Sequence, residues 1–186
     1  MHLLNLLGTV KKLNLDINIT SKKWNDHNID LNEFISKFAS EALSACNIFK
    51  IAESAELSIL LTTDQKIRKL NNEYRGKDKP TNVLSFPLQQ INPGKFLKSH
   101  ALEKVIYLGD IIFAYATIKK EALREEKDFL DHFAHLIIHG TLHLIGFDHE
   151  CDLDANQMEE IEIKLLAKFG IASPYGDKGQ INKSVY

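Results

Sequence analysis

The stretch FLDHFAHLIIHGTLHLI, residues 129–145, decides how the rest of the chain is organised. Drawn as a helix, it carries apolar side chains on nearly every side. A helix that is apolar all round is typical of the centre of a fold, because none of its faces favours water. We therefore predict a helix over Phe129–Ile145 that lies at the centre of the molecule, with the other elements packed around it.

The same helix carries two histidines at metal-ligand spacing. His139 and His143 are four residues apart, so their rings project from one face about 6 Å apart along the axis. Gly146 can end the helix in the left-handed conformation and bring His149 back to the same ion. Three histidines leave the fourth tetrahedral position to water, as in a catalytic zinc site. The sequence predicts one zinc per chain, held by His139, His143 and His149.

Other ligands and other metals remain possible at this point. Imidazole also suits nickel, copper or iron, and zinc is favoured because three histidines and a water form its usual hydrolytic set. Cys151 is a conceivable fourth ligand, although it would close the site. His135 and His132 lie near His139 and could compete, but the turn at Gly146 favours His149. We interpret His135 as a histidine of the core or one that supports a ligand.

What the motif lacks also matters. Zinc proteases of the H-E-x-x-H type take their general base from the glutamate after the first histidine. Gly140 occupies that position here, which argues against a peptidase of that mechanism. Asp148 and Glu150 could orient a ligand imidazole or accept a proton, and solvated carboxylates are the simpler interpretation of both.

Hydrophobic periodicity predicts the surrounding elements. Alternating or short apolar runs predict four strands, over Lys11–Ile19, Ala55–Leu61, Val83–Phe86 and Val105–Phe113, the last interrupted by Gly109 and Asp110. Helical spacing predicts four helices besides the central one, over Asp30–Ala45, Asp64–Tyr74, Ala114–Glu126 and Asp154–Phe169. The mixed order of about four strands and five helices indicates an α+β fold, with a mixed sheet and packed helices.

Composition limits the classes of protein that remain. With 186 residues, 44% of them hydrophobic, we expect residues 1–186 to form one domain, with residues 1–10 as an N-terminal extension and 173–186 as a flexible tail. A net charge of −2 gives no overall basic field for nucleic acid. No apolar run approaches the roughly 18 residues of a membrane span. The apolar start lacks the charge order of a signal peptide and the two cysteines make no disulfide framework, so we expect a cytoplasmic protein without a membrane partner.

A second unusual stretch is NNEYRGKDKPTNVLSFP, residues 71–87. The lysines within this stretch and just before it are most simply interpreted as solvated side chains on a helix face and a loop. Arg75 differs because it stands beside Gly76 at the junction of helix and loop. From there its guanidinium group could reach into a cleft and hold a phosphate through two hydrogen bonds.

These motifs together resemble one known family. The segments NEYR (72–75), PTNVLSFP (80–87) and LGDI (108–111), together with residues 139–149, resemble the YbeY family of bacterial rRNA-maturation endoribonucleases. The resemblance extends over roughly residues 71–149. The family usually has aspartate where this chain has Asn82, which removes a possible hydrogen-bond acceptor or capping charge. The role of that position is therefore open.

The resemblance implies an α+β fold, a zinc ion on His139, His143 and His149, and Arg75 as the functional arginine near the metal. It implies a single-strand-specific, zinc-dependent endoribonuclease that acts in rRNA processing, including maturation of the 16S rRNA 3′ end, and in ribosome quality control. The implied partners are single-stranded RNA or rRNA and a ribosomal subunit or ribosomal protein. DNA is not expected as a partner.

Two other functions stay open. The first is a zinc metallohydrolase with another substrate, such as peptides, although Gly140 argues against it. The second is a ribosome-assembly factor whose zinc is structural. Replacement of His149 would unfold that assembly factor, whereas it would leave an enzyme folded and inactive.

Overall fold

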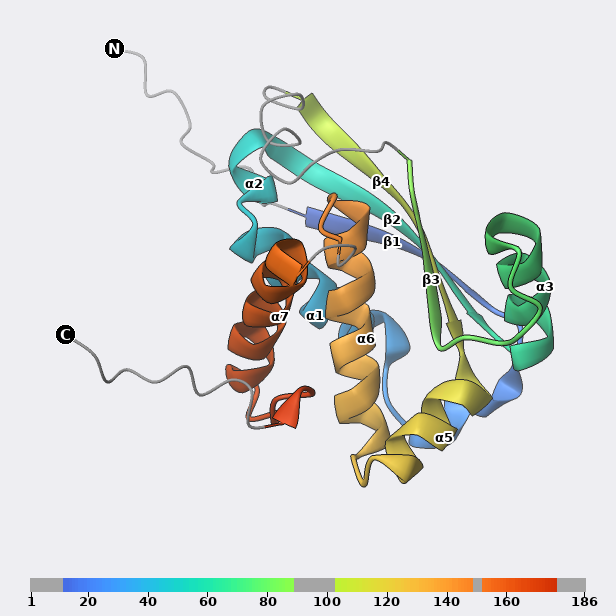
Figure 1. The fold of residues 1–186 in the computed structure, drawn as a ribbon. Coiled ribbons are helices and arrows are strands. Elements are labelled where there is room, and N and C mark those ends of the chain that lie inside the picture. The colour runs from blue at the N-terminus through green and yellow to red at the C-terminus, as the bar shows by residue number, and fades with distance from the viewer. Residues whose placement is uncertain (1–11, 89–102, 149–151, 177–186) are drawn as a thin grey trace, which may run out of the picture.

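The computed structural model describes residues 12–88, 103–148 and 152–176 (Figure 1). These ranges contain four strands, six α-helices and one 3-10 helix. In chain order they are β1 (Lys12–Ile19), η1 (Lys22–His27), α1 (Leu31–Ala45), α2 (Ile48–Ile51), β2 (Ala52–Thr62), α3 (Asp64–Arg75), β3 (Val83–Pro87), β4 (Glu103–Ala114), α5 (Tyr115–Arg124), α6 (Phe129–Leu144) and α7 (Asp152–Ala167). The predicted single-domain α+β fold is confirmed.

The four strands form one mixed sheet in the order β1-β2-β4-β3. β1 and β2 are parallel, β2 and β4 are parallel, and β3 runs antiparallel to β4. β4 is one continuous strand rather than an interrupted one. The register shifts between Glu56 and Leu57 of β2, opposite Gly109, which has a φ of 122°. A Cβ at Gly109 would lie 2.1 Å from the Phe86 carbonyl oxygen, so the bulge requires glycine.

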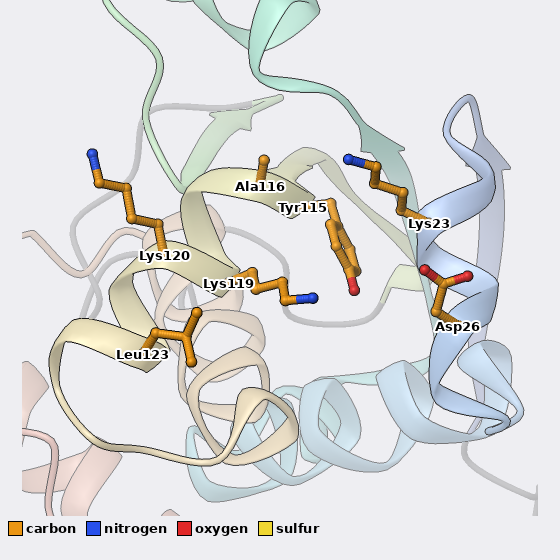
Figure 2. A pocket seen from close by; sticks show the side chains of 7 residues that line it. All are labelled: Lys23, Asp26, Tyr115, Ala116, Lys119, Lys120 and Leu123. Carbon is orange, nitrogen blue, oxygen red and sulfur yellow. The ribbon is translucent and has the colours of Figure 1, made fainter.

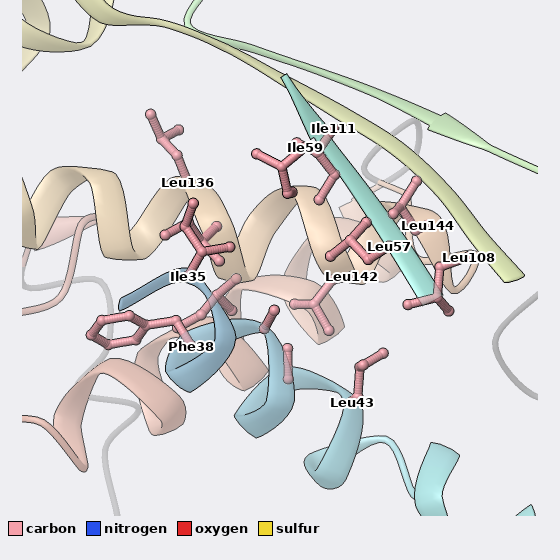
Figure 3. Close-up of a cluster of buried hydrophobic side chains, with 14 of the residues drawn as sticks. Ile35, Phe38, Leu43, Leu57, Ile59, Leu108, Ile111, Leu136, Leu142 and Leu144 are labelled. Carbon is pink, nitrogen blue, oxygen red and sulfur yellow. The ribbon is translucent and has the colours of Figure 1, made fainter. Parts of the chain in front are cut away.

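Two apolar clusters cover the two faces of the sheet. The larger one joins α1 and α6 to alternate residues of β2 and β4, including Leu57, Ile59 and Ile111 (Figure 3). The smaller one joins Ile67 of α3 to Ile112 of β4 on the opposite face. Neighbouring residues of a strand point to opposite faces, so α3 and α6 lie on opposite sides of the sheet. The predicted central position of α6 follows from its packing against this sheet, α1, α5 and α7 (Figure 1).

Two short helices were not predicted from periodicity. Neither η1 nor α2 is long enough to show a helical repeat, since they span six and four residues. η1 nevertheless places Trp24 in the core, where its ring lies 5.0 Å from that of Phe133. Thr63 caps α3, and the carboxylate of Asp64, the first residue of this helix, accepts hydrogen bonds from the backbone N–H and hydroxyl of Thr117.

Some expectations lie outside the described residues. They include the N-terminal extension over 1–10 and the part of the expected tail beyond residue 176. Among the helices of the described ranges, none has the length and apolar character that a bilayer crossing requires.

Candidate metal centre

One side of α6 carries a row of four histidines. His132, His135, His139 and His143 follow one another at spacings of three and four residues, so they lie along one face of the helix. The opposite side of α6 packs on the sheet. The row therefore faces α5 and α7, the two helices that flank α6 (Figure 1).

His139 and His143 point at each other. Their Nε2 atoms lie 3.1 Å apart. The His143 Nδ1 atom lies 2.9 Å from the carbonyl oxygen of Phe147, which only accepts hydrogen bonds, so Nδ1 carries the proton. The His139 Nδ1 atom donates in the same way to the Glu162 carboxylate, at 2.9 Å. In both neutral rings the lone pair is thus on Nε2, in the space between them.

Two lone pairs directed at each other repel unless a cation lies between them. Nitrogens bound at roughly 2.0–2.1 Å to one tetrahedral ion lie about 3.3 Å apart, close to the observed separation of 3.1 Å. The donor set therefore fits a metal ion on the Nε2 atoms of His139 and His143.

The turn after α6 follows the predicted course as far as it is described. Gly146 has a φ of 92°, and the N–H of Phe147 bonds to the carbonyl of Leu142 at 3.1 Å. The turn therefore brings the backbone of Phe147 back to His143, as the 2.9 Å contact between the Phe147 carbonyl and His143 Nδ1 shows. His149, together with Glu150 and Cys151, lies outside the described residues. Asp148 is exposed.

Glu162 of α7 anchors the middle of the histidine row. Its side chain is 0% exposed, and its two oxygens lie 2.9 Å from His139 Nδ1 and 3.1 Å from His135 Nε2. The hydroxyl of Tyr175 donates a third hydrogen bond to it. Burial by itself would raise the pKa of Glu162, but the hydrogen bonds of His135 and His139 outweigh it and hold the pKa at about 2. The buried carboxylate is therefore ionised.

Glu162 also belongs to a possible metal-binding group. The donor atoms of His135, His139 and Glu162 lie within 4.8 Å of one another, so these three residues could hold a metal ion. Glu162 is fully buried, whereas the side chains of His135 and His139 are 14% and 20% exposed. His139 belongs to both possible sites and is exposed enough to present a bound ion to a substrate.

A second carboxylate holds the first histidine of the row. Glu121 of α5 lies 3.1 Å from His132 Nε2 and accepts a hydrogen bond from the side-chain amide of Asn82 at 2.9 Å. Asn82 also accepts the N–H of Val83 at 2.7 Å. A hollow of about 340 Å³ runs past this group to His139. Asn82 thus joins the start of β3 to α5.

Gly140 is explained by packing. A Cβ at this position would lie 3.0 Å from Ile111 Cγ2 and 3.2 Å from the Ser85 hydroxyl oxygen. The Ser85 hydroxyl also donates to the Gly140 carbonyl at 3.2 Å. The position after the first histidine therefore faces the sheet, and a glutamate there would push α6 away from β3 and β4.

Arg75 does not contact the histidines. It is the last residue of α3, on the other side of the sheet, and it is exposed. Gly76 ends the helix with a φ of 65°, as the predicted junction requires. Within the described ranges Arg75 forms no hydrogen bond or ion pair, whereas Arg68 of the same helix is paired with Asp78 at 2.7 Å.

Another hollow, of about 320 Å³, lies between η1 and α5 (Figure 2). Lys23, Lys119 and Asp26 project around it, and Tyr115 forms its floor. The Tyr115 hydroxyl is bonded to His27 at 3.1 Å. This hollow gathers no set of metal ligands like that of α6, so the histidine row is the stronger candidate site.

The sequence matches the family model described as "Endoribonuclease YbeY" over residues 18–170, a range that includes β2 to β4, α6 and α7. The chain belongs to the YbeY family. Two YbeY relatives are the Endoribonuclease YbeY of Sinorhizobium medicae, 48% identical over 126 residues, and that of Azorhizobium caulinodans, 50% identical over 126 residues. The alignments cover 68% of this chain and 71% and 74% of the two relatives, respectively.

The fold also resembles a solved structure. The solution structure of TM1509 from Thermotoga maritima matches with a TM-score of 0.51 over 91% of this chain and 99% of that one. At 19% sequence identity, this likeness concerns the fold alone.

Three residues of this candidate site were not found by sequence reasoning: Glu121, Glu162 and Tyr175. A signal for Glu162 was present. The buried positions of α7 are Met158, Glu162, Leu165 and Leu166, so Glu162 stands in the apolar stripe of the helix. A carboxylate in such a stripe needs a buried partner, and the histidine row supplies it.

Proposed function

We propose that this protein is a zinc-dependent, single-strand-specific endoribonuclease that acts in rRNA processing. Membership of the YbeY family supports the cleavage of RNA. The observation that supports a metal centre is the pair of Nε2 atoms of His139 and His143, 3.1 Å apart with both protons fixed on Nδ1. His149, three residues after Gly146, is the proposed third ligand.

The choice of zinc rests on the donors. Histidine nitrogens with one open position are the usual ligands of hydrolytic zinc. When bound, zinc supplies a water of lowered pKa and polarises a phosphoryl oxygen. His139 and His143 hold the ion through Nε2, while Glu162 and the Phe147 carbonyl keep the two rings in place. With Gly140 against the sheet, this part of α6 supplies no carboxylate as a general base, which argues against a zinc peptidase of the H-E-x-x-H type.

Arg75 is the proposed phosphate-binding residue. Its guanidinium group is exposed and is not already engaged by a carboxylate within the described ranges. α3 packs behind the edge strand β3, so an RNA strand that enters from the metal side would cross β3 to reach Arg75. There the guanidinium would hold a phosphate of the bound strand through two hydrogen bonds and so keep the strand in place at the metal.

The test of Arg75 compares two arginines of one helix. We expect Arg75→Ala to keep zinc and lose RNA cleavage. Arg68→Ala removes the same charge from α3, but from a side chain already paired with Asp78, and should retain cleavage. Full activity of Arg75→Ala would contradict the proposed role of Arg75 in phosphate binding.

We further propose a ribosomal subunit or ribosomal protein as a partner in the cytoplasm. The net charge of −2 gives only a weak general attraction to RNA, so presentation of the substrate by such a partner would compensate.

The decisive experiment measures zinc and RNA cleavage in the same samples. Elemental analysis and cleavage of a fluorescent single-stranded RNA are compared for the wild type and His143→Ala. His27→Ala serves as a histidine control, because that ring stacks on Phe129 at 4.1 Å instead of facing the row. We expect one zinc per chain in the wild type and the control, and a folded His143→Ala protein that lacks both zinc and cleavage.

The other outcomes identify the alternatives. An unfolded His143→Ala protein would favour an assembly factor with a structural zinc. Zinc-bound wild type that cleaves a peptide library and no RNA would favour a metallohydrolase of peptides. Cleavage that survives in metal-free His143→Ala would contradict a zinc-dependent nuclease.

A further inference from the structure

The strongest unexplained group near the proposed metal centre is the buried cluster around Glu162. Glu162 is the only carboxylate in the described ranges whose side chain is fully buried, and it receives hydrogen bonds from three side chains. His135 and His139 come from α6, and Tyr175 comes from the turn after α7. A carboxylate buried without a counter-charge is costly, so such a cluster needs a reason beyond packing.

The geometry gives one reason. A histidine can bind a metal through Nδ1 or Nε2, and the hydrogen bond made by one nitrogen decides which is free for the metal. Glu162 lies 2.9 Å from His139 Nδ1 and so keeps the proton there. Nε2 of His139 is left to face Nε2 of His143 at 3.1 Å. A carboxylate that accepts from a ligand imidazole also raises its basicity and fixes the plane of the ring.

The other two contacts hold Glu162 itself in place. The Tyr175 hydroxyl and His135 Nε2 both meet Oε2, and this leaves Oε1 for His139. The Tyr175 ring stands against His135, with 5.8 Å between centroids. The turn that carries Tyr175 is tied to the connection between α5 and α6, since Lys127 Nζ donates to the Pro174 carbonyl at 3.3 Å. The rotamer of Glu162 is thus fixed from two sides.

We propose that Glu162, held by Tyr175 and His135, is a positioning residue that directs the Nε2 atom of His139 to the metal and sets the zinc affinity of the site. The inference deepens the proposed function and rests on its metal centre. His143 is positioned differently, by the Phe147 carbonyl of its own turn. The site therefore depends on α7 and on the turn after it, although neither supplies a ligand.

The test measures zinc affinity by competition with a chromophoric chelator. Glu162→Gln keeps the size of the side chain and removes its charge, and we expect it to weaken zinc binding about 10- to 100-fold. Tyr175→Phe leaves the carboxylate but frees it to rotate, and should cause a smaller loss in the same direction. Glu160→Gln is the matched control, because it makes the same change on an exposed turn of α7 and should leave zinc affinity unchanged.

The outcomes separate this inference from the proposed function. Wild-type protein that binds no zinc overturns both. Wild type that binds zinc and cleaves RNA, with folded Glu162→Gln and Tyr175→Phe proteins of unchanged affinity, overturns only the role of Glu162. Circular dichroism reports whether each variant is folded.

A second measurement tests the inference even if the Glu162→Gln protein fails to fold. Long-range proton–nitrogen spectra of the zinc-loaded wild type identify the nitrogen of His139 that binds the metal. Coordination through Nε2 with a protonated Nδ1 supports the inference. Coordination through Nδ1 overturns it, because Glu162 would then have lost its hydrogen bond.

Discussion

The two ends of the histidine row on α6 are built from the same kinds of residue and differ in the burial of the carboxylate that they contact. At the first end, His132 contacts Glu121, whose side chain is 21% exposed and which Asn82 also binds. From the middle of the row towards its other end, here called the interior end, His135 and His139 share Glu162, which is 0% exposed. One carboxylate thus ties α5 and β3 to α6 near the surface, and the other lies inside the molecule.

The difference shows that a histidine–carboxylate contact has two uses in one protein. Glu121 is partly exposed although His132 is buried, so water can compete for this carboxylate and weaken the contact. In the interior the carboxylate must be fully hydrogen-bonded, and the partners that satisfy it also fix the orientation of a ligand ring. For this reason we propose that the metal binds to His139, the histidine that Glu162 orients. The following predictions test the contrast.

The largest expected effect is on stability. Glu162→Ala leaves His135, His139 and Tyr175 without their acceptor, and we expect it to lower the free energy of unfolding by about 4 kcal/mol. Glu121→Ala should cost only about 1 kcal/mol, because water can replace the partly exposed carboxylate. Urea unfolding of both variants in the presence of a chelator measures the difference. Equal losses would mean that the two ends are equivalent.

Acid should affect the interior end in two steps. Burial lowers the pKa of His135, which thus resists protonation when folded, so its contribution to stability falls as the pH drops below about 6.5. The pKa of Glu162 is lowered from 4.5 to about 2, so its contribution is complete above 4.5 and is lost as the pH falls towards 2.

The second step, which comes from the protonation of Glu162, can be measured. It should amount to about 3 kcal/mol for the metal-free protein and be absent from Glu162→Gln. Unfolding free energies between about pH 6 and pH 2, obtained for both proteins, measure it. A difference between them that stays constant over this range would contradict the assignment to Glu162.

Gly140 lies beside His139 and allows α6 to pack closely on the sheet. Gly140→Ala places a methyl group 3.0 Å from Ile111, and we expect a loss of about 2 kcal/mol as α6 moves away from the sheet. His139 is its neighbour in the chain, so zinc affinity should fall as well. Ile111→Val in the Gly140→Ala background removes Cδ1, which would lie 3.2 Å from the new methyl group, and should restore part of both losses. Without such a recovery, the close contact would not be the cause.

The smallest expected effect concerns Asn82. Asn82→Asp puts a carboxylate 2.9 Å from Glu121 in place of an amide donor, and we expect a loss of about 1 kcal/mol at neutral pH with zinc binding retained. Adding Glu121→Gln should restore stability, because the new amide can then donate to the introduced carboxylate. A double-mutant cycle gives the coupling. If the effects of the two substitutions are additive, the hydrogen bond between Asn82 and Glu121 contributes nothing to stability.

Much of the fold was accessible from local patterns. β1 and α1 begin and end within one residue of their predicted bounds, and Asp30 caps α1 through the N–H groups of Asn32 and Glu33. Alternation and helical spacing are strong in these segments because each packs one face on the core. η1 and α2 were missed, since elements this short show no clear period.

The sequence by itself determined the family and the local part of the site. The spacing of His139 and His143 on one helix face and the turn at Gly146 depend only on neighbouring residues and the geometry of a helix. Only the tertiary structure decided that Glu162 and Tyr175 meet around the histidine row, and that Arg75 lies across the sheet from it. These pairings join residues distant in sequence, and side-chain burial and hydrogen bonding between packed helices, rather than any local pattern, select them.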